Sequence, residues 1–122
     1  PLLLALNSAS AREVVYDLHV TQKQVAIAGK TTEAMVINGQ LPAPTLVFQE
    51  GDIAKITVHN HLSKETSVHW HGLLVPNDQD GVPGVTNFPI APNSSFTYRF
   101  PLKHAGTYWY HSHTDLQEQR GL

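Results

Sequence analysis

The sequence contains no cysteine among its 122 residues. This absence excludes a disulfide framework, a thiolate zinc site and a cysteine nucleophile. Basic residues are also few, since the eight lysines and arginines form no cluster and the formal net charge is −2. Nucleic acids and anionic membranes attract proteins through basic surfaces, so we expect neither a nucleic acid nor a membrane as a partner.

Long hydrophobic runs are missing as well. The apolar stretch at residues 2–6 is far shorter than the roughly 20 residues that a membrane-spanning helix needs. It precedes Ala9-Ser10-Ala11, a run of small residues typical of a signal-peptide cleavage site. We therefore interpret residues 1–11 as either a signal remnant or an N-terminal extension. The remaining residues, 12–122, have the length of one folded domain.

Apolar and polar residues alternate with period two along most of the chain, and turn residues interrupt the pattern at short intervals. This pattern predicts an all-β protein, a Greek-key β-sandwich with antiparallel strands. The predicted strands are residues 14–20, 45–48, 53–62, 96–100 and 107–113, with 24–28 as a second strand or a continuation of the first. We expect an ordered loop over 75–93 and a short helical turn in the last nine residues. No strand follows the last predicted one to close the sandwich, so we expect the chain to be part of a longer protein.

In the predicted strand at residues 53–62, even-numbered positions are mostly apolar and odd-numbered positions are mostly polar. One face is apolar and the other is polar, which predicts a buried side and a wet side. The apolar face comprises Ala54, Ile56, Val58 and Leu62, and the polar face Lys55, Thr57, His59 and His61. We therefore expect His59 and His61 to be solvent-exposed and not to bind metal. His19 and His104 have no histidine neighbour in sequence, and surface positions are expected for them too.

Two His-x-His pairs carry the strongest chemical signal. Because residues i and i+2 of a strand point to the same side, His69 and His71 should aim two imidazoles in one direction. His111 and His113 should do the same on a second strand. Both pairs lie among aromatic residues and glycine, which indicates burial, and a buried imidazole without a partner is costly unless it is coordinated or hydrogen-bonded. Four imidazoles without a thiolate favour copper as the metal, with zinc as an alternative.

The strings NGQLPAPT, EGD, HWHG, DGVPGVTNFPIAP, FTYRF and GTYWYHSH, in this order, resemble the N-terminal domain of multicopper oxidases. The likeness runs from about Val14 to the last residue and is greatest to bacterial laccase-like and copper-resistance oxidases. The resemblance implies a cupredoxin fold for residues 12–122 and one half of a trinuclear copper cluster. It also implies that His69 binds the type 2 copper, His71 and His111 bind one type 3 copper, and His113 binds the other.

The resemblance also implies a role for Asp80, as an acid near the cluster that helps to deliver protons to reduced oxygen. A turn aspartate before glycine is the alternative interpretation of this residue. A blue copper site requires a thiolate, so this chain cannot build one. The expected partners are therefore the remaining cupredoxin domains, from the same polypeptide or a neighbouring subunit, together with dioxygen and a reducing substrate.

The predicted function is that of a copper-binding domain in a laccase-like oxidase that couples substrate oxidation to reduction of dioxygen to water. Two alternatives remain open: a non-catalytic module that stores or delivers copper or zinc, and a subunit of a two-domain trimeric copper oxidase. The expected location is periplasmic or secreted.

Overall fold

Strands make up most of the regular structure in the computed structural model, which describes residues 10–114 and 117–122. Two short 3-10 helices, η1 and η2, accompany the strands. In chain order the elements are β1 (Glu13–Ile27), β2 (Lys30–Ile37), β3 (Ile53–Asn60), β4 (His69–His71), η1 (Asn77–Gln79), β5 (Ser95–Pro101), β6 (Trp109–His111) and η2 (Gln117–Arg120). The all-β prediction is thus confirmed.

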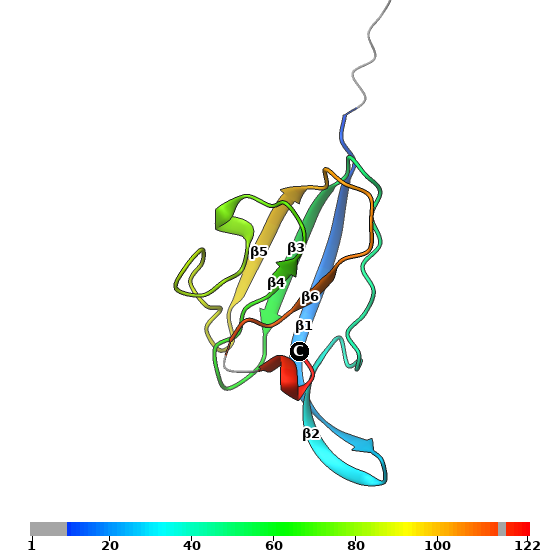
Figure 1. The fold of residues 1–122 in the computed structure, drawn as a ribbon. Helices are drawn as coiled ribbons and strands as arrows, with labels where there is room; N and C mark the ends of the chain where they lie inside the picture. The colour runs from blue at the N-terminus through cyan, green and yellow to red at the C-terminus, as the bar shows by residue number, and fades with distance from the viewer. Residues whose placement is uncertain (1–9, 115–116) are drawn as a thin grey trace, which may run out of the picture.

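Two layers of strands build the domain. A four-stranded sheet has the order β2-β1-β3-β5, and a two-stranded sheet pairs β4 with β6. The smaller sheet lies across one face of the larger one, while the β1–β2 hairpin projects at one end (Figure 1). The β1–β3 pair is parallel, unlike the other three pairs, so the expectation of purely antiparallel strands was wrong at this position. The mixed order arises because β1 pairs with β3 across a long connection, which a local sequence pattern does not encode.

The first strand is longer than its apolar pattern alone indicates. Residues 14–20 and 24–27 belong to the single strand β1, so the second stretch continues the first. The predicted strand at 45–48 was wrong, since these residues have no ladder partner among the described residues. Instead the Tyr16 hydroxyl accepts a hydrogen bond from the Val47 amide at 3.0 Å and lies 3.1 Å from the Val47 carbonyl oxygen. A side chain thus holds the segment in place of a neighbouring strand.

The predicted separation of faces on β3 is confirmed. Ala54, Ile56 and Val58 are almost fully buried, and Lys55 and Thr57 between them are partly exposed. Alternate residues therefore contribute to the core and to the outer surface of the large sheet, as the period of a half-buried strand requires.

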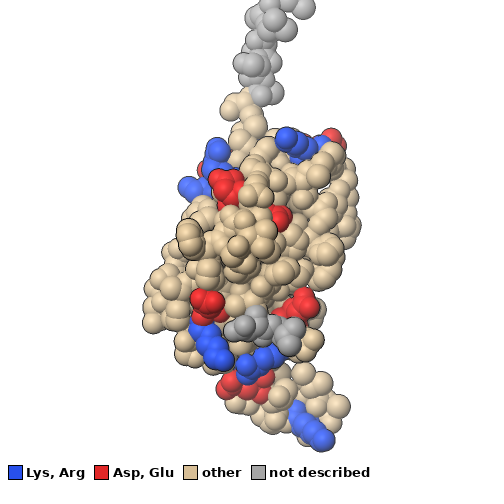
Figure 2. All heavy atoms as spheres, turned by 60° about the vertical axis from the view of Figure 1, so that its left-hand side comes forward, with Lys and Arg blue, Asp and Glu red and all other residues tan. Residues whose placement is uncertain are grey.

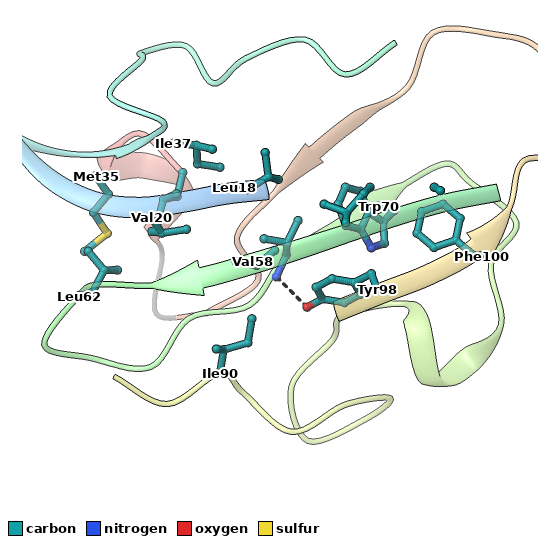
Figure 3. Packing of buried hydrophobic residues seen from close by; sticks show 14 of the residues in the cluster. Leu18, Val20, Met35, Ile37, Val58, Leu62, Trp70, Ile90, Tyr98 and Phe100 are labelled. Atoms are coloured by element: carbon teal, nitrogen blue, oxygen red, sulfur yellow. Dashed lines mark hydrogen bonds between the residues drawn. The ribbon is translucent and has the colours of Figure 1, made fainter. Parts of the chain in front are cut away.

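Aromatic side chains form the centre of the core between the two sheets. The Trp70 ring from β4 lies 5.3 Å from the Tyr98 ring and 5.6 Å from the Phe100 ring, both on β5 (Figure 3). The Tyr98 hydroxyl receives a long hydrogen bond from the Val68 amide at 3.4 Å. Burial raises the pKa of Tyr98 to about 12, because the phenolate would have to be desolvated. Trp70, the residue between His69 and His71, therefore packs the small sheet against the large one.

The connection between β4 and β5 contains η1 within the predicted loop at 75–93, and a bridge from Ile90 to Thr66 joins this loop to the segment before β4. The predicted helical turn near the end of the chain corresponds to η2, while Asp115 and Leu116 lie outside the described residues. The expected signal remnant or extension at 1–11 also lies mostly outside them. No helix among the described residues has the length and apolar character to cross a membrane.

Charged side chains are unevenly spread over one face of the domain. In the view of Figure 2 they gather toward the two ends of the molecule, and the middle of this face carries uncharged side chains. Elsewhere in the contacts of the domain, Arg12 and Asp52 form an ion pair at 2.8 Å that ties the segment before β1 to the residue preceding β3.

Candidate metal centre

The small sheet brings the two His-x-His pairs face to face. Strands β4 and β6 pair antiparallel, with His69 opposite His111 and His71 opposite Trp109. Because Trp70 points into the core, alternation sends His69 and His71 to the other side of the sheet. Their ring centroids are 5.6 Å apart, and the His69 and His111 rings are 5.5 Å apart. The predicted common orientation of His69 and His71 therefore brings both rings close to His111, whereas His113 lies outside β6.

Three of the four predicted ligands form a compact group. Nitrogen atoms of His69, His71 and His111 all lie within 4.8 Å of one another, a spacing that can hold a metal ion. The fourth ring, His113, lies 5.7 Å from the His69 ring and 6.1 Å from the His111 ring. It borders the group without joining it, so the four imidazoles extend over a larger area than one ion needs. The expected burial of both pairs was wrong for His71 and His113, which are exposed, while His69 and His111 are partly buried.

Hydrogen bonds to carbonyl oxygens determine which ring nitrogen is available in two of the histidines. The His69 Nδ1 lies 2.8 Å from the Asp80 carbonyl oxygen, and the His111 Nδ1 lies 2.8 Å from the Ser112 carbonyl oxygen. A carbonyl only accepts, so Nδ1 carries the proton in both rings. The Nε2 atoms then keep their lone pairs, which is the tautomer that a metal-binding histidine uses.

The His111 Nε2 is the clearest sign that this cluster binds an ion. The atom is buried and has no hydrogen-bond partner, although the same ring is held at Nδ1 by two acceptors, the second being the Glu118 carboxylate at 3.0 Å. A buried nitrogen without a partner costs about 1–3 kcal/mol. Coordination of a metal ion by this lone pair removes that cost, so the residues present fit a metal ion bound by imidazole.

One exposed tryptophan stacks on the cluster. The Trp109 ring lies 4.4 Å from the His71 ring and 4.4 Å from the His111 ring, in both cases nearly parallel. It restricts the rotation of one histidine from each strand. The sequence predicted a strand at this position but not this contact, because the opposition of His71 and Trp109 depends on the β4–β6 register.

A buried network of polar side chains holds the segment that carries the second pair, His111 and His113. The Gln117 side chain, 2% exposed, accepts hydrogen bonds from Thr66 at 2.7 Å and from Ser112 at 2.8 Å. Its amide nitrogen donates to the Glu65 carbonyl at 2.9 Å. Gln117 and Glu118 were missed as site residues, although the string LQEQRG belonged to the sequence resemblance. Their polar side chains immediately after a histidine pair were the available signal.

The loop after β4 supports the first pair. Asp80 supplies the carbonyl that orients His69, and one of its carboxylate oxygens lies 3.5 Å from the same Nδ1. The next residue, Gly81, has φ +75° and packs against the Val68 carbonyl so closely that a Cβ would stand 1.7 Å from that oxygen. Its amide donates to the Asn87 side chain at 2.7 Å. The predicted acid is therefore adjacent to the cluster, in a turn that requires glycine.

The other histidines lie away from this cluster. His19, His61 and His104 are exposed and His59 is partly exposed, in line with the surface positions expected for them. His19 does have a partner in space, however, since its Nδ1 lies 2.9 Å from His61 Nε2.

The fold and the site together define a class of protein: a two-layer β-domain that presents a cluster of imidazoles for a transition metal. A family model described as multicopper oxidase matches residues 19–122. The chain therefore belongs to the multicopper oxidase family, whose metal is copper.

Curated relatives support the same assignment. Copper resistance protein A of Escherichia coli is 44% identical over 115 residues, covering 94% of this chain and 19% of the relative. Multicopper oxidase MCE of Talaromyces pinophilus is 48% identical over 114 residues, covering 92% of this chain and 19% of the relative. The chain thus spans about a fifth of the length of the curated relatives that it matches.

Solved structures confirm the cupredoxin fold. A multicopper oxidase from Pseudomonas thermotolerans superposes with a TM-score of 0.89 at 35% identity, over 93% of this chain and 28% of that one. The laccase from Botrytis aclada superposes with a TM-score of 0.88 at 42% identity, over 93% of this chain and 22% of that one.

Proposed function

We propose that this domain supplies half of the trinuclear copper cluster of a laccase-like oxidase that couples oxidation of a reducing substrate to reduction of dioxygen to water. The observation that carries the proposal is the His111 Nε2, which is buried, unpaired and in a ring oriented by two acceptors. A histidine on an ordinary wet surface would have water at this atom. The His113 ring lies farther from His69 and His111 than these lie from each other, which favours a site with more than one ion.

Within this proposal each histidine has a place. His69 binds the type 2 copper, His71 and His111 bind one type 3 copper, and His113 binds the other. The proximity of His69, His71 and His111 supports this assignment, because their nitrogens lie close enough to bind neighbouring copper ions. The remaining imidazoles come from another cupredoxin domain, in the same polypeptide or in a neighbouring subunit. A blue copper site would have to lie in that part of the protein, since this chain has no cysteine to build one.

The residues of this chain fix orientation and protons. Bound copper would supply the one-electron redox chemistry for reduction of dioxygen. The Asp80 carbonyl, the Ser112 carbonyl and the Glu118 carboxylate hold the Nδ1 protons, which keeps each Nε2 directed at the metal. Trp109 covers two of the rings and limits the entry of water on that side.

Asp80 is the proposed proton carrier. Its carboxylate lies 3.5 Å from a ring that belongs to the cluster, and its side chain is 30% exposed, so it contacts both the centre and solvent. A carboxylate in this position can take a proton from water and present it at the cluster, where reduction of dioxygen consumes protons. The location of the whole protein is proposed to be the periplasm or the exterior of the cell.

The test uses His71→Ala and His111→Ala in the complete protein, with His104→Ala as the control because this exposed histidine lies outside the centre. Each of the first two variants should lose copper from the cluster and lose oxygen consumption while the blue absorption remains. The control should keep both. Full copper content with undiminished oxygen consumption in either cluster variant would refute the ligand assignment. A wild-type protein that binds copper at these residues without consuming oxygen would instead be a storage or delivery module.

A further inference from the structure

A second group of histidines lies on the opposite side of the large sheet from the β4–β6 centre. His19 on β1 is paired in the parallel ladder with His59 on β3, and His61 follows directly after that strand. Their neighbours Leu18, Val20 and Val58 are buried in the core, so alternation directs the three imidazoles to the outer face. We call His19, His59 and His61 the outer histidine cluster.

Two ring nitrogens in this cluster point at each other. His19 Nδ1 and His61 Nε2 are 2.9 Å apart, and the two rings are nearly parallel with centroids 5.2 Å apart. The contact joins two ring nitrogens directly, so a single shared proton links His19 Nδ1 to His61 Nε2. Two nitrogens bound to one metal ion at about 2.0–2.1 Å stand roughly 2.8–3.4 Å apart, for right-angled to tetrahedral geometry. A small rotation of the rings would therefore let an ion replace the proton.

A third imidazole lies beside the pair. The His59 ring stacks on the His19 ring at 4.4 Å with an interplanar angle of 8°. The His59 Nε2 lies 2.8 Å from the Asp17 carboxylate, which thus holds one nitrogen of this ring. The carboxylate also adds a negative charge beside the cluster, which favours a cation.

The backbone around these residues is fixed before any ion arrives. The Asn38 side chain accepts a hydrogen bond from the His19 amide at 2.7 Å and donates to the Asp17 carbonyl at 3.1 Å. The Asn38 amide in turn donates to the His19 carbonyl at 2.9 Å, and the His61 amide donates to the Val20 carbonyl at 3.0 Å. Both residues whose nitrogens meet are therefore held in register, so binding an ion orders little beyond the side chains.

We propose that the outer histidine cluster is a second metal site, which binds a divalent first-row transition ion with Cu²⁺ held most tightly. Imidazole ligands suit Cu²⁺, Zn²⁺ and Ni²⁺, and copper has the highest affinity of the three for nitrogen sites. His19 Nδ1 and His61 Nε2 are the two principal ligands, and His59, held by Asp17, stacks on the His19 ring and limits its rotation. The site is separated from the β4–β6 centre by the large sheet and does not depend on the function proposed for that centre.

The test measures Cu²⁺ binding to the complete protein after its resident copper has been loaded. Isothermal titration with Cu²⁺ alone should detect one further ion per chain in the wild type. His61→Gln and His19→Gln should each remove that ion or weaken its binding at least about tenfold, since each deletes one of two principal ligands. The control His104→Gln removes an exposed histidine elsewhere and should leave the titration unchanged.

Electron paramagnetic resonance on the same samples identifies the ligands. Cu²⁺ bound at the site should show hyperfine coupling to two nitrogens in the wild type and to fewer in His61→Gln. Equal stoichiometry and affinity in the wild type and both ligand variants would overturn the proposal. A wild type that binds no further ion would overturn it as well. Oxygen consumption reports on the β4–β6 centre, so neither result depends on it.

Discussion

Replacing Gly81 by alanine should damage the metal centre through the backbone alone. A Cβ at this position would stand 1.7 Å from the Val68 carbonyl oxygen, whereas real Cβ contacts essentially never fall below 3.0 Å. The two segments must therefore separate by at least 3.0 − 1.7 = 1.3 Å. That movement breaks the bond from the Gly81 amide to Asn87 and the bond from His69 to the Asp80 carbonyl. At about 0.5–1.5 kcal/mol each, the loss amounts to roughly 1–3 kcal/mol.

Gly84 provides a matched control. It has the same φ of +75° as Gly81, but a Cβ there would meet nothing within 4 Å. Alanine in the left-handed region costs about 1–2 kcal/mol at either position, so the difference between the two variants isolates the contact with Val68. Gly81→Ala should lower the melting temperature and the copper content of the complete protein more than Gly84→Ala does. Identical melting and copper content in the two variants would refute this account of the loop.

Three further predictions concern the acid, the core and the N-terminal ion pair. Asp80→Asn should keep the copper content but slow oxygen consumption, increasingly as pH rises; an unchanged pH profile would exclude its role in proton delivery. Trp70→Ala should destabilise the domain by about 3–5 kcal/mol, measured by denaturant unfolding, because it empties the centre of the core. Hydrogen bonds from the Arg12 guanidinium and then the Gln49 amide hold the pKa of Asp52 below its usual value. The stability that this carboxylate contributes is present above its unfolded pKa of about 4 and is lost as pH falls through the lowered folded value. Asp52→Asn should therefore destabilise the protein at neutral pH, with a difference from the wild type that shrinks below pH ~4; a difference independent of pH would contradict this assignment.

Properties that depend on neighbouring residues in the chain were predictable from the sequence. The two faces of β3 and the common orientation of His69 and His71 follow from the two-residue period of a strand, which holds whatever the strand pairs with. The predicted strand at 107–113 was wrong at its ends, because β6 covers only Trp109–His111 and leaves His113 outside. The position of Asp80 beside the first pair was also anticipated, through the family resemblance. The fold class followed from the same alternation and from the spacing of turns.

Properties that depend on pairing across the chain were not predictable. The segment at 45–48 has the composition of a strand, yet a strand exists only where another chain segment completes its hydrogen bonds. The stacking of Trp109 on His71, the contact of Glu118 with His111 and the meeting of His19 with His61 all depend on register or on long-range packing. Each joins residues whose sequence separation gives no periodic signal.

The most direct test of the central claim is a crystal structure of the complete protein with anomalous diffraction recorded at the copper edge. The account predicts copper about 2.0–2.1 Å from the His111 Nε2, with further copper beside His69, His71 and His113. Anomalous density absent from these four side chains, in a protein that binds copper elsewhere and reduces oxygen, would contradict it.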